Sequence, residues 1–357
     1  MSESTTAVTP AAQADLAYQD AALQGVSRTF ALTIPELPGS LRVVVGNAYL
    51  LCRIADTIED SDVLTIDEKH VAYTDFLAAV AGSGSPEQFA ADLEPKLTGK
   101  TTDAERDLIR NTPAVLRITH SFSAQDQKAL LRCVRIMAEG MEEFQESNCT
   151  RGLQDVKHLD AYCYHVAGVV GEMLTDLFCA HSSVTAERRA ELERFAVSFG
   201  QGLQMTNILK DIWDDKERDV CWLPRRTFSQ LGFDLDNLKN AKGDKSFEAG
   251  MLQLIGITRV HLEDALNYTL LIPASEPGIR KFCLWAIGMA VLSLRKLHKN
   301  LDFSSGKEVK ISRNSVKATV LVTSLLVRND GVLRLLFKLL TASLPKPSEP
   351  VIRERTA

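Results

Sequence analysis

Apolar residues in this sequence recur at the three- and four-residue spacing that places them on one side of an α-helix, and the pattern continues along most of the chain. The alternation of every second residue that marks a strand is hard to find. Gly and Pro, which interrupt helices, cluster in only a few stretches, at 33–40, 81–86, 273–278 and 344–350. The pattern therefore predicts an all-α fold, a bundle of roughly ten or more helices.

The interruptions predict one domain with two tails. We expect residues 1–20 to be a disordered N-terminal tail, residues 21–345 to form a single all-helical domain, and residues 346–357 to be a flexible C-terminal tail. Within the domain, the polar segment 87–104 predicts a surface excursion between helices.

Composition and charge narrow the class of protein. With 357 residues, 45% of them hydrophobic and 24% charged, the chain can bury a large core. A formal charge of −5 argues against the broad basic surface of a nucleic-acid-binding protein, so we expect no nucleic-acid partner. Seven cysteines without a CxxC pair indicate reduced, buried thiols, and the N-terminus lacks the basic and apolar regions of a signal peptide. These features predict a cytoplasmic protein.

The first unusual stretch is RIADTIED, residues 53–60, at the end of an apolar segment. Residues 41–58 are apolar on all sides, which is typical of a buried helix. Asp56, Glu59 and Asp60 follow the spacing i, i+3 and i+4, so their carboxylates project from one side near the C-terminal end of that helix. That end carries the negative pole of the helix dipole, so the cluster either needs a cation or lies at a solvated helix end.

A second acidic cluster, NILKDIWDD at residues 207–215, continues the apolar stripe of another helix. The stripe passes through Leu192, Phe195, Phe199 and Leu203 and then reaches Asn207, Asp211, Asp214 and Asp215. These carboxylates therefore point inward, where a charge must be paired or must bind a metal. Two such clusters facing each other across a helical cavity would supply oxygen ligands for several Mg²⁺ ions, which complete their coordination with substrate phosphate. The substrate predicted is a diphosphate.

Basic residues accompany both clusters. Arg53 precedes Asp56 by one turn, Lys210 adjoins the second cluster, and Arg218 follows it, so each could hold diphosphate oxygens. Salt bridges within each helix are the alternative. The apolar and aromatic residues around them suit a long hydrocarbon and a carbocation, which favours prenyl diphosphate chemistry.

Three stretches of the sequence, residues 26–60, 160–178 and 202–224, resemble the signature blocks of the squalene and phytoene synthase family. The resemblance covers about residues 20–300, with the blocks in the family's order, and is closest to the squalene-forming members. It implies the isoprenoid synthase fold, an all-α helical bundle with a central cavity between two aspartate-rich helices.

The resemblance also implies a reaction. Squalene-forming members are prenyltransferases of isoprenoid and sterol or hopanoid biosynthesis that join two molecules of farnesyl diphosphate head to head. The product is presqualene diphosphate, which is then rearranged and reduced by NADPH to squalene. The implied cofactors are NADPH and Mg²⁺, for which Mn²⁺ could substitute. A non-reducing dehydrosqualene or phytoene synthase, or a non-catalytic helical scaffold, are the alternatives.

Matching positions imply the site residues. The metal ligands implied are Asp56, Glu59, Asp60, Asp211, Asp214, which replaces the family's usual Glu, and Asp215. The implied diphosphate-binding residues are Ser27, Arg28, Arg53, Gln204, Asn207, Arg218 and Lys210, which stands where the family often has Arg. The implied catalytic residues are Tyr162, Arg53, Arg218, Phe30 and Tyr49. Lys310 and Arg313 are predicted contacts for the NADPH phosphates.

Association with a membrane is predicted to be weak. Residues 319–345 mix apolar turns with Arg328, Arg334 and Lys338, which is typical of an interfacial helix pair rather than of a membrane span. We expect peripheral contact with the inner membrane, and a packed helix pair without lipid contact is the alternative. The choice between C15 and C20 substrates and the oligomeric state are left open by the sequence.

Overall fold

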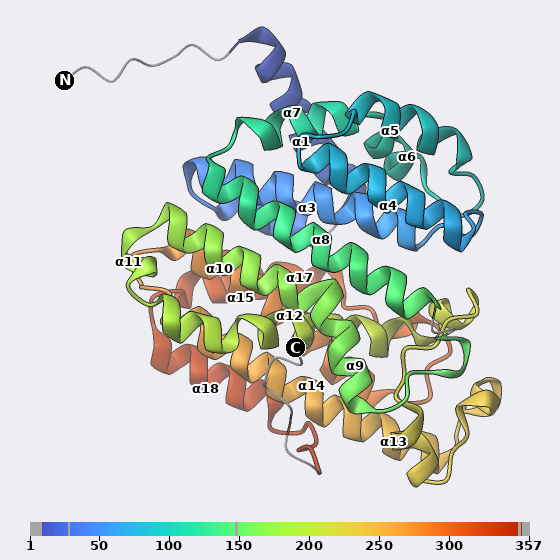
Figure 1. Cartoon of the computed structure of the whole chain (residues 1–357). Coiled ribbons are helices and arrows are strands. Elements are labelled where there is room, and N and C mark those ends of the chain that lie inside the picture. The colour runs from blue at the N-terminus through green and yellow to red at the C-terminus, as the bar shows by residue number, and fades with distance from the viewer. Residues whose placement is uncertain (1–8, 28, 147–148, 349–350, 352–357) are drawn as a thin grey trace. The chain divides into compact units, whose positions relative to one another are not determined.

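A computed structural model of the chain describes residues 9–27, 29–146, 149–348 and 351. Every named element within these residues is a helix, and their only β-bridge joins Leu153 to Pro224. The prediction of an all-α fold is therefore confirmed (Figure 1). Contacts between residues divide the chain into two compact units, residues 1–138 and residues 139–357, where the sequence predicted one domain over 21–345.

Unit 1 contains the helices up to the start of α8. Its elements are α1 (Pro10–Val26), α2 (Phe30–Thr33), η1 (Ile34–Glu36), α3 (Gly39–Glu59), α4 (Ile66–Val80), α5 (Pro86–Leu93), η2 (Glu94–Lys96), α6 (Asp103–Arg110), α7 (Thr112–Ser121) and α8 (Ala124–Glu146), which contains the boundary.

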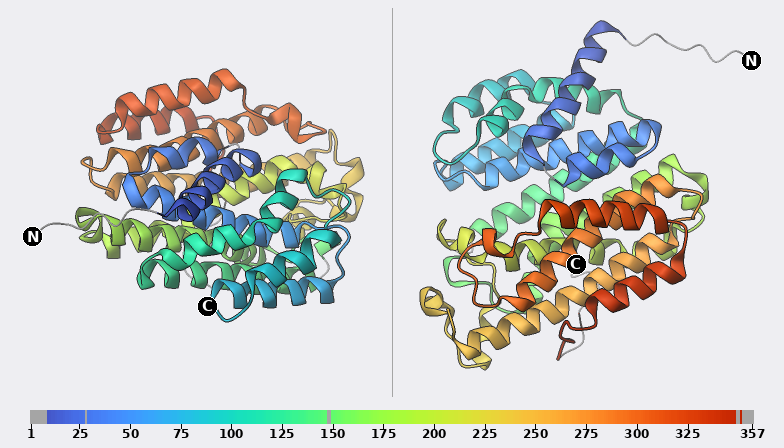
Figure 2. Two further views of the ribbon diagram at one scale, coloured as in Figure 1. Left: turned by 90° about the horizontal axis from the view of Figure 1, so that it is seen from above. Right: turned by 180° about the vertical axis from the view of Figure 1, so that it is seen from behind.

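Unit 2 contains the longest helices, with α17 and α18 as its last two, in orange to red (Figure 2). Its elements are η3 (Cys149–Arg151), α9 (Val156–Cys163), the π-helix η4 (Tyr164–Gly168), α10 (Val169–His181), α11 (Ser183–Ala186), α12 (Arg189–Lys216), α13 (Arg225–Gln230), η5 (Leu235–Asn240), α14 (Lys245–Leu271), α15 (Pro277–Lys299), α16 (Gly306–Val309), α17 (Arg313–Leu326) and α18 (Asp330–Thr341).

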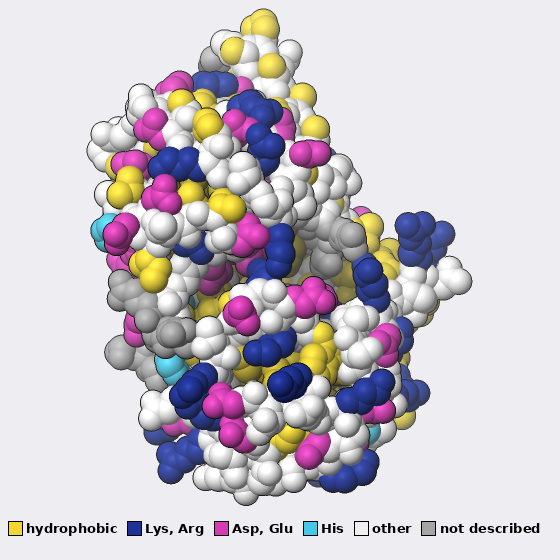
Figure 3. Space-filling model, turned by 90° about the vertical axis from the view of Figure 1, so that its right-hand side faces the viewer, with side chains coloured by type: hydrophobic (Ala, Val, Ile, Leu, Met, Phe, Trp, Pro, Cys, Tyr) yellow, Lys and Arg dark blue, Asp and Glu magenta, His cyan; other side chains and the backbone are white. Residues whose placement is uncertain are grey.

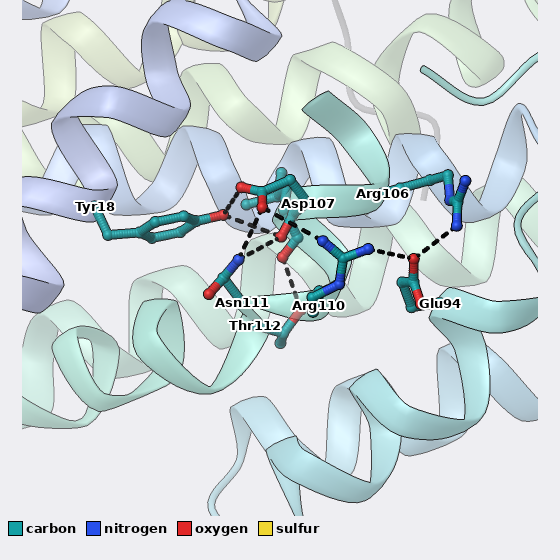
Figure 4. A network of polar contacts seen from close by, with 8 residues as sticks. Tyr18, Glu94, Arg106, Asp107, Arg110, Asn111 and Thr112 are labelled. Carbon is teal, nitrogen blue, oxygen red and sulfur yellow. Dashed lines mark hydrogen bonds and ion pairs between the residues drawn. The ribbon is translucent and has the colours of Figure 1, made fainter. Parts of the chain in front are cut away.

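Helix α1 corrects the prediction that residues 1–20 form a disordered tail. Residues 1–8 lie outside the described residues, but α1 begins at Pro10, with Thr9 as its N-cap. The hydroxyl of Tyr18 donates to the Asp107 carboxylate of α6 over 3.0 Å (Figure 4), and Arg117 of α7 donates to Asp15 over 2.7 and 2.8 Å. Polar contacts attach this helix to unit 1, so its low hydrophobicity misled the sequence prediction.

The polar segment 87–104 is likewise more structured than predicted. Helix α5 begins at Pro86 and buries Phe89 and Leu93. Glu94, in η2, accepts hydrogen bonds from Arg106 and Arg110 of α6 over 2.9 and 2.7 Å (Figure 4). The segment is therefore packed into unit 1 rather than projecting from it.

The core of unit 2 is formed by α12, α14 and α15, which pack on one another. Helix α15 is the one described helix that is long and apolar enough to cross a membrane, judged by length and composition alone. Because 61% of its apolar window is buried in the protein, it has the surroundings of a core helix. Lys346 and Pro347, assigned by the sequence to a flexible tail, lie against α14, where a Cβ on Gly256 would come within 2.9 Å of their backbone.

Six cysteines are buried free thiols, as predicted: Cys52, Cys133, Cys163, Cys179, Cys221 and Cys283. The side chain of Cys149 lies outside the described residues. On the face drawn in Figure 3, acidic and basic side chains are interspersed.

Candidate active-site residues

The first acidic cluster lies at the C-terminal end of α3, where the sequence predicted it. Asp56 and Glu59 are half-buried on the last turn, and Asp60, the C-cap, is exposed. The Lys69 ammonium of α4 donates to the backbone carbonyl of Glu59 over 2.6 Å. A cation thus already stabilises the negative end of the helix, although it does not bond the carboxylates in this contact.

Arg53 is held by a residue that the sequence analysis did not single out. Its guanidinium donates to the carboxylate of Glu105, which also caps α6 at Thr102, and it lies 3.7 Å from the carboxylate of Asp56. Burial raises the pKa of Asp56 to about 7; Arg53 lowers it, and the charges of Asp60 and Glu105 raise it. Because Arg53 is shared with Glu105, the acidic cluster of α3 is only partly neutralised.

Ser27, Phe30 and Tyr49 lie together before and along α3. The Ser27 hydroxyl accepts the backbone N–H of Phe30 over 2.9 Å, and the rings of Phe30 and Tyr49 are 5.2 Å apart. The Tyr49 hydroxyl donates to the carbonyl of Val26 over 3.1 Å, and burial raises its pKa. Ser27, the C-cap of α1, therefore accepts the first backbone N–H of α2 in this structure, while the predicted phosphate contact Arg28 lies outside the described residues.

The second acidic cluster lies on the last two turns of α12. The Lys210 ammonium is 3.1 Å from the carboxylate of Asp211 and donates to the amide oxygen of Asn207 over 3.2 Å. Burial raises the pKa of Asp211, and the charge of Lys210 opposes that rise. A Cβ on Gly306 of α16 would lie 3.1 Å from oxygens of both Asp211 and Asp214. The two carboxylates therefore converge on one point beside α16.

Asp215 and Arg218 form a pair at the end of α12. Asp215 is buried, and its carboxylate accepts from the Arg218 guanidinium over 2.7 Å. Asp215 also lines a small pocket with Trp222 and four apolar residues, Ile208, Ile212, Cys221 and Leu223. Gln204 is half-buried and Asn207 exposed on the same helix.

Tyr162 is buried on α9 and is stacked on an aromatic side chain of that pocket. Its ring lies 3.8 Å from the ring of Trp222, with the two planes 9° apart, and the edge of Phe144 is 5.2 Å away. The stack places the tyrosine against the same residue that adjoins Asp215. Trp222 lies in the third signature block, residues 202–224, but the sequence analysis did not single it out, because the tyrosine on which it stacks lies 60 residues earlier in the chain.

Glycines set the position of the tyrosine segment on α12. A Cβ on Gly171 of α10 would lie 1.9 Å from the carbonyl oxygen of Ala196, and one on Gly200 of α12 would lie 2.0 Å from that of Ala167. The two backbones are therefore in direct contact, which only glycine permits at these points. The π-helix η4 lies at this contact and begins two residues after Tyr162, and such irregular turns are frequent at functional sites.

A buried polar network lies next to Tyr162 in the sequence. Asp160 of α9 is 2% exposed, and neither of its carboxylate oxygens has a hydrogen-bond partner among the described residues. Its Oδ1 is 4.0 Å from Nε2 of His261 on α14. Nδ1 of His261 is 2.7 Å from the Ser198 hydroxyl, which itself donates to Asp264 over 3.2 Å.

This network favours one imidazole tautomer. When the Ser198 proton goes to Asp264, Nδ1 of His261 is the donor to Ser198, and in a neutral imidazole Nε2 then carries no proton. Burial, together with the charge of Asp155, raises the pKa of Asp160 to about 7. A protonated Asp160 facing an unprotonated Nε2 is consistent with both observations.

Comparison with known proteins places these residues in a family. A model of the squalene/phytoene synthase family matches residues 23–315. The chain belongs to this family. The acidic, aromatic and glycine contacts of the candidate site, from Ser27 to Gly306, involve residues within the matched region.

Individual proteins and solved structures that are similar to this chain agree with the family assignment. The squalene synthase of Gibberella zeae is 28% identical over 290 residues, which cover 80% of this chain and 59% of the Gibberella zeae protein. A ligand complex of TcSQS is similar over 94% of both chains, with a TM-score of 0.73 and 24% identity. A dehydrosqualene synthase with bound ligand covers 89% of this chain and 98% of its own, with a TM-score of 0.65 and 20% identity. These structures confirm the predicted isoprenoid synthase fold.

The chemistry of the two acidic clusters fits a hydrated divalent cation. Among the described residues, no three His, Cys, Asp or Glu side chains form a group that could hold a metal. Mg²⁺ is usually bound through one or two carboxylates, with waters and substrate phosphate completing its octahedron, so clusters of this kind suffice. The carboxyl groups of Asp56 and Asp211, whose pKa values are raised, lack full neutralisation, which is the condition that a cation relieves.

The two predicted NADPH contacts lie on unit 2 beyond α16. Lys310 is the C-cap of α16, and its carbonyl accepts from the Lys296 ammonium over 2.6 Å. Arg313 is the first residue of α17. Both side chains are exposed.

Proposed function

We propose that the chain is a squalene synthase, which joins two farnesyl diphosphates head to head to presqualene diphosphate and then converts this intermediate to squalene with NADPH. Family membership and the named relatives support a prenyl diphosphate as substrate. The single observation that carries the proposal is in unit 2. Trp222, on which Tyr162 stacks, lies beside Asp215, and Asp215 pairs with Arg218 next to the acidic cluster of α12.

Each group there has a role in the departure of a diphosphate. Arg218 is one-third exposed, so its guanidinium can hold a phosphate oxygen while Asp215 keeps it oriented. The stacked pair Tyr162–Trp222 would stabilise, through a ring face turned away from the stack, positive charge on the allylic carbon that the leaving group exposes. The hydroxyl of Tyr162 is the group that would remove a proton from that cation during formation of the cyclopropane ring.

Unit 1 supplies a second set of groups of the same kinds. Arg53, fixed by Glu105, presents a guanidinium next to the carboxylates of Asp56 and Asp60. Tyr49 and Phe30 provide an apolar aromatic surface for the hydrocarbon. Two farnesyl diphosphates need two places for phosphate and two for hydrocarbon, and each unit carries residues for one of each.

The proposed cofactors would act on the charges of the reaction. Mg²⁺ held by Asp56, Glu59, Asp60, Asp211, Asp214 and Asp215 would neutralise the leaving diphosphate, and NADPH would supply the hydride of the reduction. Lys310 and Arg313 would bind the NADPH phosphates, because both are exposed cations that follow α16, the helix beside Asp211 and Asp214.

Products formed from candidate substrates test the proposal. The chain is incubated with Mg²⁺ and either farnesyl or geranylgeranyl diphosphate, and the lipids are analysed by mass spectrometry. We expect C30 products from the C15 substrate, little C40 product from the C20 substrate, and no turnover in EDTA. A C40 product formed preferentially would identify a phytoene synthase. Absence of any condensation product would contradict the proposal and favour the alternative of a non-catalytic helical scaffold.

A dehydrosqualene synthase is the second candidate. A solved dehydrosqualene synthase is similar in fold to this chain over 89% of this chain's residues. Such an enzyme would give a C30 product whether or not NADPH is present.

A further inference from the structure

Helix α17 carries apolar side chains on the side that faces away from the protein. Thr319 and Thr323 are buried, whereas Leu321 is 62% exposed and Leu325 is 76% exposed. Val322 lies between the two leucines and is also exposed. The leucines and the threonines occupy opposite sides of the helix. An amphipathic helix on a protein surface normally turns its apolar side chains toward the core and its polar side chains toward solvent, which is the reverse of what α17 does.

Packing against α15 fixes this orientation. A Cβ on Gly288 of α15 would lie 2.4 Å from the methyl group of Thr319, so the two helices are in close contact at this point. The hydroxyls of Thr319 and Thr323 donate to the carbonyls of Ser315 and Thr319 over 2.9 and 2.7 Å, so their burial leaves no donor unsatisfied. A rotated helix would place a larger leucine where only glycine and threonine fit.

Helix α18 also exposes apolar side chains, although it buries an apolar stripe of its own. Leu333 and Phe337 are buried against the protein, while Leu335 is 55% exposed and Leu339 is 65% exposed, with Val332 beside them. Both helices contact α15 and each other, so their outward sides adjoin on the surface of unit 2. Six of the twelve large hydrophobic side chains that are exposed among the described residues lie on these two helices.

The same helices concentrate positive charge. Residues 313–341 contain one acidic residue, Asp330, whose carboxylate is 2.7 Å from the guanidinium of Arg280. They contain five basic residues, Arg313, Lys317, Arg328, Arg334 and Lys338. All five are exposed, in a chain whose formal charge is −5. The basic character is therefore local to these helices.

We propose that this surface, the α17–α18 face, docks on a membrane that contains anionic lipids. The face consists of Leu321, Val322, Leu325, Val332, Leu335 and Leu339 with the basic residues Lys317, Arg328 and Lys338. Its leucines enter the headgroup region, and its cations contact lipid phosphates. A second copy of the chain is a poorer occupant, because a symmetric contact would bring the same cations together. The inference rests on this surface alone and not on the proposed reaction.

Flotation with lipid vesicles tests the docking. The full chain is mixed with vesicles of equal parts phosphatidylglycerol and phosphatidylcholine, or of phosphatidylcholine alone. We expect binding to the anionic vesicles that weakens with salt. The triple variant Leu321→Gln, Leu325→Gln, Leu339→Gln and the triple variant Lys317→Gln, Arg328→Gln, Lys338→Gln should each bind about a hundredfold more weakly.

A matched control and a second measurement make the result decisive. Ile66→Gln with Val71→Gln removes two hydrophobic side chains of α4 that are 54% and 57% exposed, and it should leave vesicle binding unchanged. Circular dichroism should show all variants folded, because every substituted side chain is exposed. Absence of vesicle binding, or binding that survives both triple variants, would overturn the proposal. So would a dimer in light scattering that the leucine variant converts to monomer, since the face would then bind a second copy.

Discussion

Replacing Asp160 by Asn removes a buried charge and keeps the shape of the side chain. Asp160 is 2% exposed, without a hydrogen-bond partner for its carboxylate among the described residues, and burial raises its pKa to about 7. An acid whose pKa is raised on folding binds more protons in the folded than in the unfolded state. The stability that it contributes is therefore fully present below the ordinary carboxyl pKa and is lost as the pH rises through about 7.

The magnitude follows from the two pKa values. The difference between the ordinary 3.8 and about 7 corresponds to roughly 4 kcal/mol of unfolding free energy lost at high pH. The amide of Asn carries no charge, so the variant escapes this loss. We expect Asp160→Asn to be more stable than the parent at pH 8, by about 2 kcal/mol or more, and this advantage to shrink by about half or more at pH 5.

Urea unfolding at pH 5 and pH 8 measures both numbers. Asp75→Asn, which changes an exposed carboxyl of α4, serves as the control and should show no such difference between the two pH values. If Asp160 instead carries a charge paired with protonated His261, Asn would leave a buried cation alone and destabilise the protein by about 3–5 kcal/mol. Loss of stability in the variant at pH 8 would refute the assignment of neutral Asp160 and neutral His261.

Three further predictions concern the site. Asp60→Asn and Asp211→Asn should each leave a folded chain with turnover reduced about a hundredfold or more, because the leaving diphosphate loses its metal template; near-normal turnover, equal to that of the control Asp92→Asn, would remove these clusters from the site. Gly171→Ala should lower the free energy of unfolding by about 3 kcal/mol in a denaturant titration, since the new methyl group meets a backbone carbonyl at 1.9 Å, whereas Gly331→Ala, where the nearest atom is the Asn329 side-chain oxygen at 3.7 Å, should be nearly neutral. Lys310→Ala with Arg313→Ala should raise the NADPH concentration for half-maximal squalene formation about tenfold or more and leave presqualene diphosphate formation unchanged; an effect on both steps would contradict a role confined to NADPH.

Local patterns in the sequence were sufficient for the helices and for the residues that act within one helix. Asp56 and Glu59 lie on the last turn of α3 and Asp60 is its C-cap, as their i, i+3 and i+4 spacing predicts. Asp211 and Asp214 lie on one side of α12 for the same reason. Such positions depend only on helical geometry, which apolar periodicity makes visible.

Contacts between distant segments were the part that the sequence did not reveal. Glu105 lies 52 residues from Arg53 in the chain. The TxxE capping box that contains Glu105 predicts the start of a helix, but it does not predict that Glu105 pairs with Arg53. Trp222 and Tyr162 are similarly far apart. Helix α1 was missed because polar side chains, Asp15 and Tyr18, attach it through hydrogen bonds, which a hydrophobicity pattern does not record.

The measurement closest to the central claim follows the hydride. The chain is supplied with farnesyl diphosphate, Mg²⁺ and NADPH that carries deuterium at the transferable position, and the C30 product is analysed by mass spectrometry. A squalene synthase should give squalene with one deuterium, and without NADPH it should stop at presqualene diphosphate or divert to dehydrosqualene or hydroxylated products. An unlabelled C30 product that is identical with and without NADPH would contradict the proposed function and identify a non-reducing member of the family.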